Sequence, residues 1–151
     1  MEYNKSNKMM GNRSSFQNNN QDEKGAEAAN LLAAYQSEWL LNEANPKMID
    51  FSEKAGKFMA KNGLTNSQIR NVFGEIKRIQ MAGYEKDKAS FLLLKPKMAY
   101  AASRNKNDGL NLFKDIFNRS FLDITSEKSY LNFCKFIESI LAYHKAYGGK
   151  D

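Results

Sequence analysis

The chain has 151 residues, 23 of them Lys or Arg and 17 Asp or Glu, so its formal charge at pH 7 is +6. Apolar residues make up 42%, which suffices for one compact domain, and no apolar run approaches the ~18 residues of a membrane span. The single cysteine, Cys134, and the single histidine, His144, exclude an internal disulfide framework and a Cys/His zinc site within one chain.

The first residues form a polar segment. Residues 1–24 are rich in asparagine and carry little apolar surface beyond Phe16. Folding such a segment would bury too little apolar surface to offset the loss of conformational entropy. We therefore expect a disordered tail over residues 1–24 and one helical-bundle domain over residues 25–151. The tail lacks the apolar part of a secretory signal, and a lone cysteine suits a reducing compartment, so a cytoplasmic location is expected.

Two helices are expected before Gly63. The first covers residues 26–41, and its apolar positions at helical spacing are Leu31, Leu32, Tyr35 and Trp39. Asn45-Pro46 separates it from a second helix over residues 47–62, whose apolar positions are Phe51, Ala55, Phe58 and Met59. Gly63 supplies a C-terminal cap, and Leu64 after it is expected to pack back against the helix that Gly63 ends.

The third helix has the clearest start, because Gln68 follows Thr65 by three residues and completes a capping box. One apolar stripe follows, made of Ile69, Val72, Phe73, Ile76 and Ile79. Gly83 and its neighbours end this helix.

The rest of the chain is also helical in pattern. A fourth segment runs from about residue 87 to residue 105, and Pro96 either kinks it or opens a new helix. Residues 107–109 predict a turn, residues 110–116 or a little further a short helix, and residues 125–128 the cap of a last helix through Tyr147. The apolar positions of that last helix are Leu131, Cys134, Phe136, Ile137, Ile140, Leu141 and Ala142. No segment alternates as a strand does, so the predicted class is all-α, a compact bundle of about five helices.

The net charge is concentrated in the third and fourth helical segments. Residues 65–106 hold nine Lys or Arg against three acids, which equals the whole net charge of +6. Two helix flanks carry the cations seven residues apart, about 10 Å along the axis. The members are Arg70, Gly74, Lys77 and Met81 on one helix, and Lys97, Tyr100, Ala101 and Arg104 on the other.

These flanks predict a polyanion-binding face, with cations for phosphates and Tyr100 as a ring that stacks or hydrogen-bonds. A solvated basic face is an equally good description of the same pattern. Lys54, Lys57 and Lys61 form a further stripe that we interpret as a solvated face. Close packing against another helix is the favoured reason for Gly74, and approach of nucleic acid is the second.

The residues do not predict an enzyme. His144 has no nucleophile or carboxylate placed beside it by a recognisable motif, and a single-His ribonuclease with Lys as its second acid is the remaining enzymatic alternative. Cys134 lies on an apolar stripe and is expected in the core. No metal site, phosphate-cradling loop or cofactor motif is found, so no cofactor is expected.

Three segments in order resemble the small subunit of type III-A CRISPR effector complexes, the Csm complexes. They are LTNSQIRNVFGEIKRIQ (residues 64–80), LLKPKMAYAASR (residues 93–104) and FCKFIESILAYHKAYGG (residues 133–149). The first 24 residues and the helix over residues 26–41 lie outside these motifs.

The resemblance implies a five-helix bundle without catalytic activity, acting in antiviral defence. Copies of the subunit would stack beside the other Csm subunits, line the channel of the guide RNA–target RNA duplex, and contact target RNA without reading its sequence. Cleavage would belong to other subunits, and no membrane partner is implied. The motif positions that also form the basic flanks are Arg70, Lys77, Arg78, Lys97 and Arg104, and Tyr100 joins them as an expected RNA-binding residue.

Two other functions remain open from the residues. A structural helical adaptor would dock acidic protein surfaces through the same basic zone, and the salt dependence of RNA binding separates it from an RNA-binding subunit. A small DNA-binding repressor would need a helix-turn-helix, with which the junction at residues 63–65 is only loosely compatible.

Overall fold

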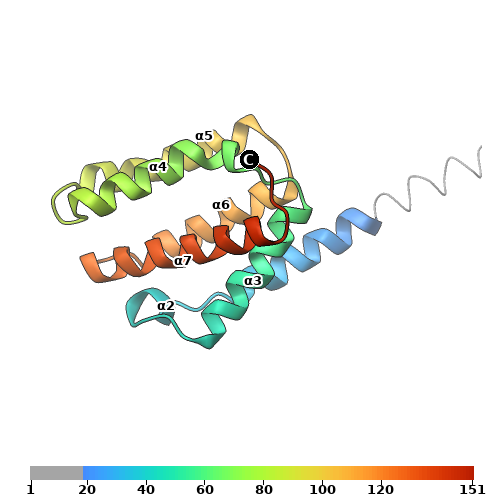
Figure 1. Cartoon of the computed structure of the whole chain (residues 1–151), viewed down its shortest axis with the longest axis horizontal. Coiled ribbons are helices and arrows are strands. Elements are labelled where there is room, and N and C mark those ends of the chain that lie inside the picture. The colour runs from blue at the N-terminus through green and yellow to red at the C-terminus, as the bar shows by residue number, and fades with distance from the viewer. Residues whose placement is uncertain (1–18) are drawn as a thin grey trace, which may run out of the picture.

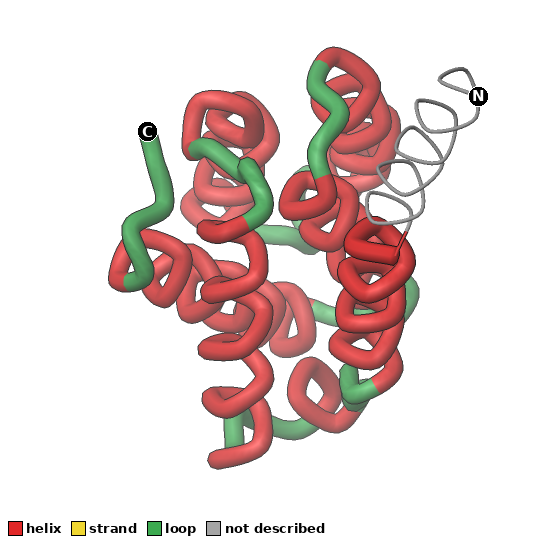
Figure 2. The backbone as a smooth tube through the Cα atoms, turned by 90° about the vertical axis from the view of Figure 1, so that its right-hand side faces the viewer, coloured by secondary structure: helices red, strands yellow, loops and turns green. Residues whose placement is uncertain are grey.

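The computed structural model describes residues 19–151, which are helical apart from short connections (Figure 2). A helix over residues 19–33 is followed by α2 (Glu38–Leu41), α3 (Pro46–Lys61), α4 (Asn66–Ala82), α5 (Lys88–Arg104), α6 (Asp108–Phe121) and α7 (Glu127–Ala146). In this range no strand occurs, and extended pairing is confined to one isolated bridge between Thr65 and Lys150. The predicted all-α class is confirmed.

The helices stack in three layers (Figure 1). The middle layer is α6 and α7; α2 and α3 cover one side of it, and the adjacent helices α4 and α5 cover the other. Aromatic rings fill the first interface, where the Phe51 centroid lies 5.1 Å from Trp39 and 5.7 Å from Phe136. Such ring pairs add to the stabilisation from burial alone. The helix α7 contributes to both interfaces, so it is the centre of the core.

Side-chain caps explain where the helices begin. The Gln68 side chain accepts the Thr65 backbone N–H at 3.1 Å, as the predicted capping box requires. Asn45 and Asn107 cap α3 and α6 by accepting backbone N–H groups from the third residue on, at 3.0 and 2.7 Å. Gly63 follows α3 with φ +96°, a left-handed conformation that glycine adopts without strain.

The described residues hold seven helices, so the predicted number of about five was too low. The expected helix over residues 26–41 is broken between residues 33 and 38. A continuous helix would place Leu40 about 140° around the axis from Tyr35, yet both side chains are buried. The break allows both side chains to reach the core. The Tyr35 hydroxyl also donates a hydrogen bond of 2.9 Å to Asp123, which follows the end of α6.

The expected turn at residues 107–109 was also wrong. Asn107 is the cap of α6, and Gly109 lies in its first turn, where a Cβ atom would sit 2.7 Å from the Met59 carbonyl oxygen. An asparagine followed by Asp-Gly suits a helix start as well as a turn, because the Asx side chain accepts backbone N–H groups in both. The helix α6 continues to Phe121, well past residue 116, while α5 runs through Pro96 without ending.

The N-terminal boundary differs in part from the expected tail. Residues 19–24 belong to the first helix and are exposed, whereas residues 1–18 of the expected tail lie outside the described residues. Among the helices of the described range, none is both long and apolar enough to cross a membrane.

Candidate nucleic-acid interface

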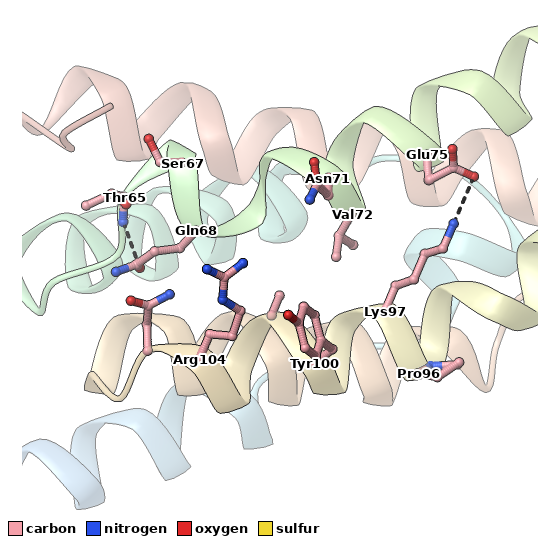
Figure 3. Close-up of a pocket in the computed structure, with 12 residues that line it drawn as sticks. Thr65, Ser67, Gln68, Asn71, Val72, Glu75, Pro96, Lys97, Tyr100 and Arg104 are labelled. Carbon is pink, nitrogen blue, oxygen red and sulfur yellow. Dashed lines mark hydrogen bonds and ion pairs between the residues drawn. The ribbon is translucent and has the colours of Figure 1, made fainter.

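A groove of about 810 Å³ separates the adjacent helices α4 and α5 (Figure 3). Positions spaced three or four residues apart share one face of a helix, so each helix presents one row to the groove. The row on α4 is Gln68, Asn71, Val72 and Glu75, and the row on α5 is Lys97, Tyr100, Ala101 and Arg104. Both rows lie beside the buried stripes that fix the two helices on the core, such as Ile69 and Ile76 on α4.

One end of the groove is positively charged. Arg104 and Tyr100 project from α5 towards α4 (Figure 3), with the guanidinium carbon 5.7 Å from the ring centroid. The Tyr100 side chain is exposed, with 63% of its surface accessible. Within residues 19–151, Arg104 makes no ion pair with a carboxylate. The Gln68 side chain, held by the Thr65 and Asn107 N–H groups, closes this end.

The other end of the groove contains paired charges. The Glu75 carboxylate accepts from Arg78 Nη2 at 3.0 Å and lies 3.4 Å from Lys97 Nζ. Arg78 Nη1 also lies 3.3 Å from Asp87, the cap of α5. Hydrogen bonding from Arg78, followed by the charge of Lys97, lowers the pKa of Glu75, and hydrogen bonds from Ser90 and then from Arg78 lower the pKa of Asp87. Both carboxylates are therefore ionised at neutral pH.

The remaining predicted cations lie on the other side of α4. Arg70 and Gly74 line a groove of about 550 Å³ between α4 and α7, and Lys77 forms an ion pair with Glu138 of α7. The predicted flank of Arg70, Gly74 and Lys77 thus shares one side of α4, but that side faces away from α5. The favoured reason for Gly74 was wrong, because a Cβ atom there would meet nothing within 4 Å.

The structure therefore brings together three of the six predicted RNA-binding residues, Lys97, Tyr100 and Arg104, with Arg78 at the rim of their groove. Arg70 and Lys77 belong to the α4–α7 side. Sequence reasoning missed the polar row of α4, although its i, i+3, i+7 spacing was readable. It also counted Glu75 only as a minor offset to the local charge. RNA binding by these residues stays a prediction.

The one histidine and the one cysteine of the chain are both buried. His144 is fully buried, and its Nε2 lies 2.7 Å from the Leu64 carbonyl oxygen, which only accepts, so Nε2 carries the hydrogen. Cys134 is buried as expected, and burial raises the pKa of its thiol to about 12. In residues 19–151 no three His, Cys, Asp or Glu side chains gather in a way that would hold a metal ion.

The comparisons with known proteins assign the chain. No curated protein matches it. A family model described as Csm2 Type III-A matches residues 42–150, which contain α3 to α7, both grooves and all three resembling segments. The first helix and α2 lie outside the match. A match over most of the sequence, with the all-helical bundle and its basic zone, shows that the chain belongs to the Csm2 Type III-A family, the small subunit of the type III-A Csm effector complex.

Proposed function

We propose that this subunit lines the channel of the guide RNA–target RNA duplex and contacts target RNA through phosphates, without reading its sequence and without catalysing its cleavage. Csm2 is a structural subunit family, which supports a role in positioning RNA alongside other subunits and further copies of itself. The subunit contributes charge and shape, while the chemistry of cleavage lies elsewhere.

The observation that carries this proposal is the pairing of Arg104 with Tyr100 at one end of the α4–α5 groove. A guanidinium without a carboxylate partner in the described residues is available to a phosphate, and an exposed ring beside it offers a stacking surface. Phosphates carry no sequence information, and stacking tolerates every base. Recognition of this kind suits a subunit that accepts any target.

The test replaces Arg70, Lys77 and Arg104 with Ala together, in the assembled Csm complex, and measures target RNA affinity over a range of salt concentrations. Each lost phosphate contact removes about 0.7–1 from the slope of log affinity against log salt. Lys77 is already paired with Glu138, so the loss comes mainly from Arg70 and Arg104, and we expect the slope to fall by about 1.4–2, equally for unrelated target sequences.

The matched control replaces Lys54, Lys57 and Lys61 of α3 with Ala, which removes the same charge from the opposite outer layer and should leave the slope unchanged. Unchanged target affinity in the first variant would reject the proposal. If that variant also failed to assemble into the complex, the basic zone would instead dock acidic protein surface, as in the adaptor alternative.

A further inference from the structure

We propose that Glu75 is an intrachain competitor for RNA phosphate, which keeps one end of the α4–α5 groove neutral until RNA displaces it. This inference rests on the RNA-binding function proposed above and concerns the regulation of the same groove. The RNA affinity of one subunit would then be controlled by an acidic residue rather than by a further cation.

The contacts of Glu75 carry the argument. Its carboxylate is the one acidic group that lines the groove in the described residues. It lies 3.4 Å from Lys97 Nζ (Figure 3) and also accepts from Arg78 at 3.0 Å. With Asp87 on the far side of Arg78, two cations face two carboxylates at this end. The local charge therefore sums to zero, although the surrounding segment is strongly basic in sequence.

The two ends of the groove differ for an incoming strand. Among residues 19–151, Arg104 has no carboxylate partner. Lys97, seven residues earlier and about 10 Å away along α5, is instead neutralised by Glu75. A stacked strand, with one charge per ~3.4 Å of helix axis as in a duplex, covers that distance in about three nucleotides. An RNA held at Arg104 thus brings further phosphates to Lys97, where each must replace Glu75 as the acceptor.

The ion pairs of Glu75 with Arg78 and Lys97 are weak enough for an RNA phosphate to displace its carboxylate. The side chains of Glu75, Arg78 and Lys97 are 27%, 48% and 47% exposed, so solvent screens both ion pairs. Exposed pairs of this kind contribute little each, and losing the two as competitors corresponds to an effect of about three- to tenfold in Kd. Glu75 therefore attenuates RNA binding without abolishing it.

The experiment uses the full-length chain and a labelled oligouridylate, with fluorescence anisotropy measured over a series of KCl concentrations. We expect Glu75→Gln to bind about three- to tenfold more tightly and to steepen the salt slope by about 0.7–1.4, which is one or two added phosphate contacts. The control Asp50→Asn makes the same charge change and also frees a lysine, Lys54, but on α3. It should change affinity by less than about twofold, because its effect is only long-range and screened.

A double-mutant cycle isolates the competitor role. Lys97→Ala should cost little in the native sequence, where Glu75 already occupies this lysine, and should remove most of the gain when combined with Glu75→Gln. Thermal melts of each variant establish that it is folded, and Glu75→Asp, which withdraws the carboxylate by one methylene group, should tighten binding in the same direction.

The outcomes separate this inference from the proposed function. If Arg104→Ala weakens RNA binding while Glu75→Gln behaves like Asp50→Asn, the competitor role of Glu75 is overturned and the RNA-binding function stands. If Arg104→Ala binds as the native chain does, both are overturned. If no variant binds RNA even at low salt, the competitor role is overturned, and the proposed function is decided by the triple variant in the assembled complex.

Discussion

At the level of single residues, two helical glycines show how packing decides what a sequence pattern leaves open. Gly56 of α3 faces α7, where a Cβ atom would lie 2.7 Å from the Ile140 carbonyl oxygen and from the His144 backbone nitrogen. Gly74 of α4 has open space in the same position. Both look alike in sequence, since each stands in the middle of a helical pattern. Only the neighbouring helix distinguishes them, and helix neighbours are not readable from one sequence.

The two glycines give opposite predictions for the same substitution. Gly74→Ala should raise the free energy of unfolding by about 0.5–1 kcal/mol, because alanine loses less entropy in a helix. Gly56→Ala should lower it by about 1–3 kcal/mol, because the α3 and α7 backbones would have to separate. Urea unfolding of the two variants measures both values. A stabilised Gly56→Ala protein would mean that α3 and α7 are not in close contact.

The buried thiol gives a prediction about alkaline pH. Burial raises the pKa of Cys134 to about 12, against about 8.5 in an unfolded chain. Between these values the unfolded state binds fewer protons than the folded state, so the free energy of unfolding falls as pH rises. Over about pH 9 to pH 10, the native chain should lose up to about 1.4 kcal/mol more than Cys134→Ala does.

Buried Tyr35 and Tyr130 also lower the stability towards pH 10, because the pKa of an unfolded tyrosine is about 10 and burial raises it in the folded chain. Both proteins contain these tyrosines, so the difference between the two proteins reports the thiol. The check is urea unfolding of both proteins at each pH. Parallel losses would show that the thiol is open to solvent.

The cations of the candidate interface mark the limit of single-residue prediction. Their positions along each helix followed from spacing, and Lys97, Tyr100 and Arg104 do share one groove. Their partners did not follow: Lys77 pairs with Glu138, 61 residues away, on a different helix. Whether a cation is free or paired depends on tertiary contacts of this kind, and so does its availability to RNA.

At the level of elements, local chemistry fixed the helix starts better than it fixed the helix lengths. Thr65 with Gln68 and Asn45 before Pro46 act through hydrogen bonds within four residues, and these starts were readable. The break before α2 depends on Asp123 and on the burial of Tyr35 and Leu40 together, so no local signal announces it. The predicted division between a tail and one domain remains a prediction for residues 1–18.

Truncation at each end tests which elements the fold requires. A chain that starts at Gly25 should melt near the full-length value, because residues 19–24 are exposed and contribute little to the core. A chain that ends at Thr125 should show no cooperative transition. It lacks Phe133, Phe136 and Ile140 among other fully buried residues of α7, each worth about 1.5–3 kcal/mol, and a domain is stable by only about 5–15 kcal/mol. Thermal melts followed by circular dichroism decide, and a stable, cooperative fragment of residues 1–125 would contradict the central place of α7.

At the level of the whole molecule, the all-α class followed from periodicity, but the layering did not. The apolar stripes indicate which face of each helix is buried, but they do not indicate which helix covers that face. The pairing of α3 with α7 and of α4 with α5 is a choice among many packings of similar stripes. The candidate groove arises from that choice, which is why the polar row of α4 was not anticipated.

The burial of His144 predicts that the subunit alone does not cleave RNA. The ring is enclosed and bonded to the Leu64 carbonyl oxygen, so it cannot exchange protons with a bound strand. Purified full-length chain incubated with labelled RNA and Mg²⁺ or Mn²⁺ should leave the RNA intact. Cleavage that co-purifies with the chain and disappears in a folded His144→Gln variant would contradict this prediction.

The central position of α7 has a consequence for biosynthesis. The helix that joins the two outer layers is translated after α2 to α6, so the apolar faces of α3 and α4 remain uncovered on the ribosome until it is made. At about 5–20 residues per second, synthesis of its 20 residues takes about 1–4 seconds. During that interval Trp39 and Phe51 have no Phe136 to pack against. The nascent chain is then open to chaperones, proteases and neighbouring nascent chains, and translation speed through residues 127–146 becomes a determinant of yield.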